Sequence, residues 1–590
     1  MHFASLAVAT VVVVAAGVSA NQRIPEDHYL WGPGGRPTTM RHVRRADGAT
    51  SSHVKSTVKS TFTKVSSSST SFVSNQASSS TSTSATSSSS STSTEVADPS
   101  CTNGPDSRAC WENGYSISTD FDEKWPTTGN TVYYNLEITN TTCNPDGNGE
   151  RVCLVVNNQL PGPTIYASWG DTVSVTVKNS LPSNGTGIHW HGVRQLNTNT
   201  QDGTNGITEC PLAPGDTKTY LFQATQYGTS WYHSHYSSQY GDGVIGGIVF
   251  EGPATSNYDI DLGTYAIQDW FYQTAFQIED EATVNLQSGS GPPPADNILL
   301  NGTNQNAAGG GQYGNVQLTP GKKHRLRLIN TSVDNSIRVS LDDHPFTVIT
   351  SDFVPIQPFT TNWILLAIGQ RYDVIITANQ TPGNYWFRAE AATDCASSNN
   401  FYGRSIFTYS GTTVADPTTN GTTAPSICED ASPLEPWWNT TVPSSDFTSQ
   451  VQDLEVNIDV EQITTNNQSI VVWGVNLTGI DIDWENPTLE YVVTGNNSYP
   501  QVYNLIELPT EGIWTYWIIQ EPSDTPVPIP HPIHLHGHDF FILGTGSGVF
   551  DKTTSTAALN FDNPPRRDTT FLPGGGWVVL AFETDNPGAW

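Results

Sequence analysis

The chain has 590 residues, of which 36% are hydrophobic, and a formal net charge of −31 at pH 7. Its length calls for more than one domain, since a domain usually holds roughly 100–200 residues, and the apolar content is enough for several packed cores. The acidic balance argues against nucleic acid or an anionic membrane as a partner, because both are bound by basic surfaces. We therefore expect an acidic, well-solvated surface with no nucleic-acid or membrane partner.

The first residues, 1–20, have the features of a secretory signal peptide. The run from Ala4 to Ala20 is uncharged and mostly apolar, and Val18-Ser19-Ala20 resembles a small-residue cleavage site, although the usual basic n-region is missing. This run is too short for a comfortable membrane span. Ten Asn-x-Ser/Thr sequons also favour a secreted, extracellular glycoprotein. They begin at Asn140, Asn184, Asn301, Asn330, Asn379, Asn420, Asn439, Asn467, Asn476 and Asn496.

Two polar segments follow the signal. Residues 21–45 end in Arg44-Arg45, which is either a dibasic processing site that closes a propeptide or an accidental basic pair in a disordered arm. Residues 46–97 are dominated by Ser and Thr and lack the apolar content needed to fold. We predict that they form a disordered linker.

From Asp98 onward the sequence has the pattern of an all-β protein. Short runs rich in Val, Ile, Thr, Tyr and Phe are separated by Gly, Pro, Asn and Asp, as in residues 172–177, 372–377 and 577–582. This pattern is typical of β-sandwiches. The length requires at least two sandwiches, and three fit better. We place them at residues 98–255, 256–425 and 426–590.

The seven cysteines are an odd number, and secretion favours disulfides. Each of three pairs encloses a short, turn-rich or polar stretch. The predicted disulfides are therefore Cys101–Cys110, Cys143–Cys153 and Cys395–Cys428. Cys210 is left over as a free thiol, an intermolecular bridge or a residue whose partner is missing.

Three histidine-rich segments stand out. They are His189-Trp190-His191, His233-Ser234-His235 and His531-Pro532-Ile533-His534-Leu535-His536, and they hold seven of the 14 histidines. In a strand, residues two apart point to the same face, so each His-x-His offers two imidazoles in one direction. A single pair of this kind is often accidental, but three in one chain predict a metal site.

The number of imidazoles narrows the choice of metal. Imidazole suits zinc, copper, iron and nickel, whereas a catalytic zinc usually has three protein ligands. Seven histidines are too many for one zinc ion. A multinuclear copper site fits this pattern better.

With the residues that flank them, the three segments resemble, in order, three of the four copper signatures of multicopper oxidases, in particular ascomycete-type fungal laccases. The resemblance runs from about Cys101 to the end of the chain. It implies three cupredoxin-like Greek-key β-sandwiches, with a type 1 copper in the third and a trinuclear cluster between the first and third. Further matches are residues 202–206, 239–243, 369–374, 566–570 and 585–590.

The same resemblance implies a role for each histidine. His189 and His534 would bind the type 2 copper, and His531 would bind the type 1 copper. The type 3 pair would be bound by His191, His233, His235 and His536.

The resemblance also implies a reaction. A laccase takes electrons singly from phenolic or similar aromatic reductants, including those of lignin degradation, and reduces dioxygen to water. Asp334 matches the substrate carboxylate, which accepts the phenolic proton, and Asp171 resembles an acid that assists proton delivery to the cluster. The structural alternatives are a loop acid that caps a turn for Asp334 and a turn residue for Asp171. We expect the protein to act as a monomer.

One departure from the family pattern is large. The fourth signature, His-Cys-His-x-x-x-His, is expected just after Trp590 and is absent from the sequence. It would supply the type 1 Cys and His and two type 3 histidines. The resemblance also implies that Cys210 pairs with a Cys near the C-terminus of the family's proteins. We therefore expect an incomplete third sandwich and no activity from the chain as given. The alternatives are another multicopper oxidase, acting on ascorbate or metal ions, and a non-catalytic, truncated copper-binding secreted protein.

Overall fold

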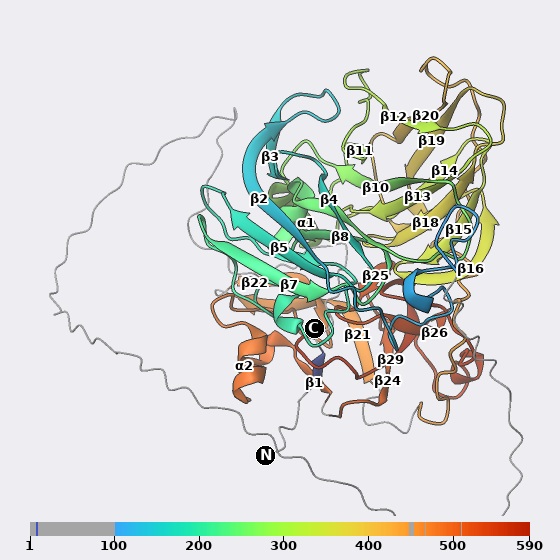
Figure 1. Ribbon diagram of the computed structural model, residues 1–590. Coiled ribbons are helices and arrows are strands. Elements are labelled where there is room, and N and C mark those ends of the chain that lie inside the picture. Colours follow the sequence, from blue (N-terminus) through green and yellow to red (C-terminus); the bar gives the residue numbers. More distant parts are fainter. Residues whose placement is uncertain (1–6, 10–100, 448–453, 466–467, 509) are drawn as a thin grey trace, which may run out of the picture. The chain divides into compact units, whose positions relative to one another are not determined.

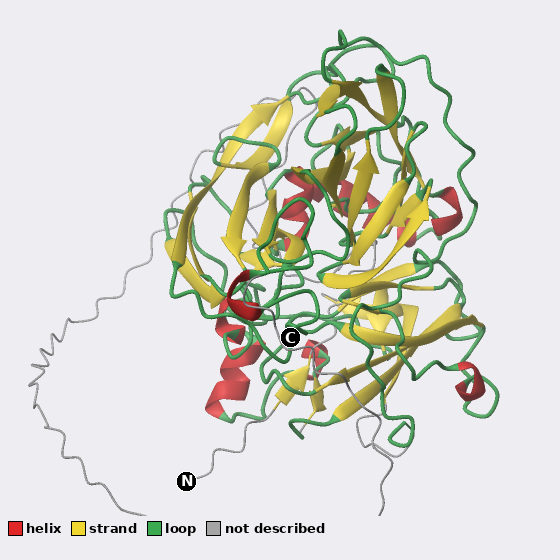
Figure 2. Ribbon diagram, turned by 45° about the vertical axis from the view of Figure 1, so that its right-hand side comes forward, coloured by secondary structure: helices red, strands yellow, loops and turns green. Residues whose placement is uncertain are grey.

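Strands dominate the structure, as the alternating apolar sequence predicts (Figure 2). The computed structural model describes residues 7–9, 101–447, 454–465, 468–508 and 510–590. Nearly all of the predicted signal peptide, and the whole predicted propeptide and Ser/Thr-rich linker, lie outside the described residues. The limits of the three domains at residues 255 and 425 remain predictions.

The first domain contains two four-stranded sheets, drawn in blue and green in Figure 1. Alternation explains the strands: in the run from Thr172 to Val177, the side chains of Val173, Val175 and Val177 are fully buried. One sheet has the order β3-β2-β5-β7, and its strands are β2 (Thr131–Cys143), β3 (Arg151–Val156), β5 (Thr172–Asn179) and β7 (Thr217–Gln223). The other has the order β4-β9-β8-β6, with β4 (Gly162–Ser168), β6 (Ile188–Trp190), β8 (Gly228–Ser234) and β9 (Ile245–Glu251).

The second domain has a six-stranded and a five-stranded sheet around a separate hydrophobic core. The orders are β11-β10-β13-β18-β15-β16 and β12-β20-β19-β14-β17. The strands are β10 (Ile260–Trp270), β11 (Asn297–Leu300), β12 (Gly314–Leu318), β13 (Lys323–Asn330), β14 (Ile337–Leu341), β15 (Phe346–Ser351), β16 (Val354–Thr361), β17 (Ile364–Leu366), β18 (Arg371–Thr377), β19 (Asn384–Ala391) and β20 (Gly403–Tyr409).

The third domain pairs a six-stranded sheet, β22-β21-β24-β29-β26-β27, with the short sheet β25-β28. Its strands are β21 (Leu454–Thr465), β22 (Gln468–Val475), β24 (Trp514–Gln520), β25 (His531–His534), β26 (Phe540–Ser547), β27 (Arg566–Arg567), β28 (Thr569–Leu572) and β29 (Gly576–Glu583). A further strand, β23 (Ile506–Leu508), pairs with β1 (Ala7–Ala9).

Helices are few and short. The α-helices are α1 (Ala275–Leu286) and α2 (Thr488–Thr494), and α1 begins with a capping box between Thr274 and Gln277. Within the described residues, no helix has both the length and the apolar character needed to cross a bilayer. The 3-10 helices are η1 (Glu112–Gly114), η2 (Asn199–Gln201), η3 (Ser237–Asp242), η4 (Thr393–Cys395), η5 (Gln501–Tyr503) and η6 (Thr556–Ala558).

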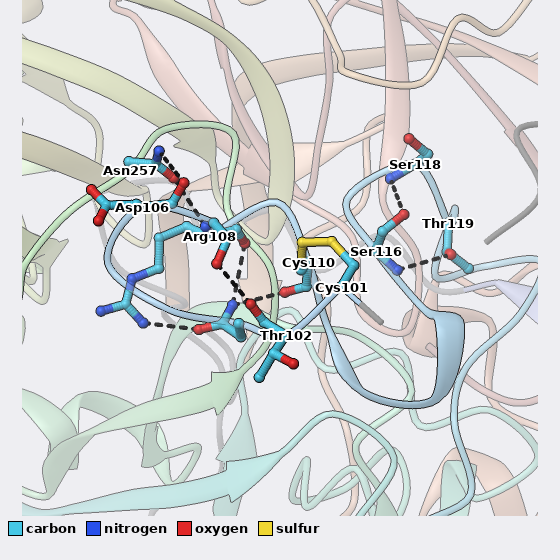
Figure 3. Close-up of a disulfide and its surroundings, with 11 residues drawn as sticks. Cys101, Thr102, Asp106, Arg108, Cys110, Ser116, Ser118, Thr119 and Asn257 are labelled. Carbon is cyan, nitrogen blue, oxygen red and sulfur yellow. Dashed lines mark hydrogen bonds between the residues drawn. A yellow bond between two sulfur atoms is a disulfide. The ribbon is translucent and has the colours of Figure 1, made fainter. Parts of the chain in front are cut away.

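All three predicted disulfides are confirmed: Cys101–Cys110, Cys143–Cys153 and Cys395–Cys428. Cys210 is free and exposed. Figure 3 shows the Cys101–Cys110 bridge, which closes a loop that also carries Arg108. The backbone N–H of Arg108 donates to Asn257 Oδ1 (2.9 Å), so this loop is tied to the segment that joins the first two domains.

Candidate metal centre

The three histidine segments lie at the strands β6, β8 and β25. These strands meet between the first and third domains. His189 lies on β6, and the antiparallel register places it opposite His233 on β8. His191 and His235 follow directly after these two strands. The third segment begins on β25 with His531 and His534, and His536 follows the strand.

Six of the seven predicted ligands form one cluster. The ring centroid of His189 lies 5.9 Å from that of His191, 5.4 Å from His233, 5.6 Å from His235, 6.2 Å from His534 and 3.8 Å from His536. All of these rings are buried except that of His235, which is part-exposed. Ligand atoms within 4.8 Å of one another define three sets: His189/His191/His233, His189/His534/His536 and His191/His534/Asp568.

Carbonyl oxygens fix the protonation of three of the rings. Nδ1 of His189 lies 3.0 Å from the carbonyl oxygen of Asp202, Nδ1 of His233 lies 3.0 Å from that of Ser234, and Nδ1 of His534 lies 2.7 Å from that of Asp568. A carbonyl only accepts, so each Nδ1 carries the proton and each Nε2 keeps a free lone pair. Nε2 of His189 and Nε2 of His534 are buried without a hydrogen-bond partner. Buried nitrogens without partners are rare, and these two suit a metal ion.

The environment also keeps the imidazoles neutral, as metal ligation requires. Burial, together with neighbouring histidines, lowers the pKa of His191, His233 and His536 well below the ordinary value. The same causes lower the pKa of His235 to about 4. These four rings are therefore neutral at neutral pH, each with a proton on one of its two nitrogens.

Two carboxylates that the sequence analysis missed lie against the cluster. Asp202 Oδ2 is 3.0 Å from His536 Nδ1, and Asp202 Oδ1 is 3.2 Å from His189 Nδ1. Asp568 Oδ1 is 3.5 Å from both His191 Nε2 and His534 Nδ1. Burial acts to raise the pKa of both acids, but the adjacent imidazoles (for Asp202) and Arg371 (for Asp568) hold it well below its usual range. A sequence signal existed, since both acids stand in matched segments, 202–206 and 566–570.

The structure places Asp171, the predicted proton-delivery acid, in a turn. Its carboxylate accepts hydrogen bonds from Thr128 Oγ1 (2.5 Å) and from the backbone N–H of Ser168 (2.9 Å), just before β5. These contacts support the structural alternative for Asp171. The acids beside the histidine rings are Asp202 and Asp568.

Asp334 lies in the loop after β13, and the buried carboxylate of Asp269 holds this loop through backbone hydrogen bonds. Asp269 accepts the backbone N–H groups of Val333, Asp334 and Asn335 at 2.9–3.0 Å. Burial, together with the charge of Asp269, raises the pKa of Asp334 to about 7. Asp334 lines a cavity of about 310 Å³ whose walls also include His233, His235 and Trp473. The structure thus connects this acid to the histidine cluster through one cavity.

His531 stands apart from the cluster although it shares a strand with His534. Its Nε2 lies 3.0 Å from Oε1 of Glu521, while its Nδ1 is buried and has no partner. Trp473 packs edge-on against the ring, with 4.7 Å between centroids. His531 therefore offers one oriented, free nitrogen.

Known proteins match both the sequence and the fold. Three family models, each described as multicopper oxidase, match residues 137–255, 262–412 and 461–590. The chain belongs to the multicopper oxidase family. Its three sandwiches are accordingly cupredoxin-like domains, and copper is the cofactor of this multicopper oxidase.

Several relatives are laccases. Laccase-3 of Botryotinia fuckeliana is 58% identical over 439 residues, covering 73% of this chain and 96% of that protein. Laccase-1 of Melanocarpus albomyces is 46% identical and covers 84% of this chain and 80% of that protein. The crystal structure of a laccase from Botrytis aclada has a TM-score of 0.74 and 41% identity, covering 83% of this chain and 89% of that chain. This multicopper oxidase is thus a laccase-like oxidoreductase.

Proposed function

We propose that this protein oxidises phenolic substrates one electron at a time and couples this oxidation to the reduction of dioxygen to water. The observation that carries the proposal is the six-histidine cluster: Nε2 of His189 and of His534 are buried without a partner, and four of its rings line one cavity with Asp334. Copper, when bound, supplies one-electron redox chemistry at imidazole ligands. Carbonyl oxygens and carboxylates orient the rings in the absence of metal. Histidine ligands of metals usually have such partners on their other ring nitrogen.

Each histidine has a proposed assignment that follows the family pattern. His189 and His534 hold the type 2 copper. His531 holds the type 1 copper through Nδ1, since Glu521 occupies its other ring nitrogen. The type 3 pair is held by His191, His233, His235 and His536.

Asp334 is the proposed proton acceptor for the phenol. A carboxylate accepts a proton only when it is ionised, and the raised pKa of about 7 makes it a stronger base than an ordinary Asp. The backbone N–H groups that bind Asp269 fix the loop and thereby the position of this acid. Asp202 and Asp568 orient the rings of the cluster instead.

These 590 residues by themselves are proposed to bind copper at the cluster, while phenol oxidation is proposed for the protein with a completed type 1 site. A type 1 site requires a thiolate, but six of the seven cysteines are in disulfides. The seventh, Cys210, is exposed, with its sulfur 3.9 Å from the carbonyl oxygen of Glu485. We propose that the type 1 site around His531 needs a thiolate beyond these seven cysteines.

The predicted leader at residues 1–20 and the sequons support secretion of the protein. The net charge of −31 favours small reductants and dioxygen as partners over nucleic acid or a membrane. We propose that it acts as a monomer.

The test uses the 590-residue chain and a version extended by a His-Cys-His-x-x-x-His segment. We expect both to bind Cu²⁺ with a type 2 electron paramagnetic resonance signal, and only the extended chain to show intense blue absorption and phenol-dependent oxygen uptake. A folded chain that binds no copper would contradict the proposal. Oxygen uptake with ferrous iron or ascorbate, but not with a phenol, would replace it with another multicopper oxidase activity.

A further inference from the structure

The second domain contributes no His-x-His segment, yet one of its arginines reaches the histidine cluster. Arg371, the first residue of β18, is fully buried. Its Nη1 and Nη2 donate to Oδ1 and Oδ2 of Asp568, each at 2.6 Å. This two-pronged contact fixes the carboxylate in both position and plane.

Asp568 in turn holds two rings from different domains. Its carbonyl oxygen accepts from Nδ1 of His534, and its Oδ1 lies 3.5 Å from that nitrogen and from Nε2 of His191. The two rings stack with centroids 3.8 Å apart and planes 9° apart. Thr569 Oγ1 bridges the same atoms, lying 2.9 Å from Asp568 Oδ1 and 3.2 Å from His191 Nε2.

The guanidinium also decides the role of Asp568. His191, His534 and Asp568 are close enough together to form a metal-binding set. Because Arg371 engages both carboxylate oxygens, Asp568 acts as a support for the imidazoles and not as a competing ligand.

Two further contacts connect Arg371 to the first domain. Its Nε donates to the carbonyl oxygen of Thr229 on β8 at 3.2 Å. A Cβ atom at Gly192 would lie 2.3 Å from Asp568 Oδ2 and 2.7 Å from Arg371 Nη2. The glycine that follows His191 therefore leaves the space that this ion pair needs. Arg371 contacts all three domains at the point where the cluster is assembled.

We propose that Arg371 is a positioning residue for the copper cluster, which holds Asp568 under His191 and His534 and thereby couples copper binding to docking of the second domain. The inference rests on the proposed function only in taking these two histidines as copper ligands. The second domain is then part of the metal site, although it supplies no ligand.

A matched control separates this role from simple loss of a buried ion pair. Arg325 is also buried in the second domain, where it binds Asp373 and lies 3.3 Å from the hydroxyl of Tyr258. Its contacts lead to the interface of the first two domains and not to a histidine of the cluster. Arg371→Gln and Arg325→Gln thus remove comparable buried charges.

The experiment compares the full chain with Arg371→Gln, Arg371→Lys and Arg325→Gln by Cu²⁺ titration against a competing chelator. We expect Arg371→Gln to weaken copper binding about 10- to 100-fold, the size typical of outer-shell partners of metal ligands, and to alter the type 2 resonance signal. Arg371→Lys keeps the charge without the planar fork, so it should recover only part of the affinity. Arg325→Gln should retain the wild-type affinity and signal.

A copper affinity and signal in Arg371→Gln equal to those of Arg325→Gln would overturn the proposal. If Arg371→Gln does not fold, Arg371→Lys compared with Arg325→Lys decides in the same way. A crystal structure of copper-free Arg371→Lys gives an answer without metal: we expect the stacking of His191 on His534 to be lost, and unchanged rings would overturn the proposal. Wild-type protein that binds no copper would refute the proposed function, while the copper-free structure would still decide the positioning role.

Discussion

One strand, β25, carries histidines to two very different regions. His534, with His536 just beyond the strand, joins four rings from the first domain, and Asp202 and Asp568 support them. His531, three residues before His534, has Glu521 on one nitrogen and Trp473 against its ring. Among the described residues, no second histidine ring packs against His531. The first region is assembled from several segments of the chain, and the second offers a single imidazole.

This difference determines how far copper binding in each region depends on a single segment of the chain. If one histidine of the cluster is removed, several imidazoles with fixed tautomers remain there. A mononuclear site with one free nitrogen depends wholly on ligands from elsewhere. The cluster should therefore bind copper by itself, and the His531 region should not.

The largest effect is expected from removing one of the stacked rings of the cluster. His536→Ala deletes the ring stacked on His189 and leaves the Asp202 carboxylate without one of its donors. We expect the copper content of the purified protein to fall by at least one ion per chain, as measured by atomic absorption. His531→Ala is the control, and equal loss in the two variants would erase the distinction between the regions.

A smaller effect is expected from the acid beside these rings. Asp202→Asn keeps the shape of the side chain but removes the negative charge near His189 and His536. Loss of such a partner typically weakens metal binding about 10- to 100-fold. Competition titration with Cu²⁺ measures this change, and Asp171→Asn, at the turn acid, should leave the affinity unchanged. If the two variants behave alike, Asp202 does not support the cluster.

The smallest effect on copper binding is expected at Asp334, which lines the cavity next to the cluster, and this acid is tested through the stability of the fold. Its pKa is raised from an ordinary 3.8 to about 7. Between these two pH values, Asp334 is therefore protonated in the folded state and ionised in the unfolded state. Wild-type stability should therefore fall as pH rises through this window, and Asp334→Asn should remove that part of the fall. We expect a difference of up to roughly 4 kcal/mol between pH 4 and pH 8 in chemical denaturation, because each unit of pKa shift corresponds to about 1.4 kcal/mol. Parallel pH profiles would show that Asp334 titrates normally.

The fold and the histidine cluster could be predicted from the sequence because both depend on local patterns. Alternation identified the strands, as in the buried valines of β5, and the His-x-His spacing identified the rings. Helix α1 was missed, although Thr274 and Gln277 have the spacing of a capping box.

The supporting groups were harder to find. Asp171 and Asp202 both stand in polar, glycine-containing segments, and only the fold shows that one closes a turn while the other meets His189. The ion pair between Arg371 and Asp568 joins residues 197 positions apart, so no local pattern reveals it. Tertiary packing, and not spacing, assigns these residues to the site.

The register between β6 and β8 has a practical consequence. Successive residues of a strand face opposite sides, so a slip of one residue would turn His189 toward the apolar core and Trp190 toward the cluster. At present Trp190 packs on Tyr220 and Phe222 in that core. A chain with the wrong pairing would therefore lose its copper together with its packing. Copper content per chain thus measures the fraction of correctly paired molecules in a refolded sample.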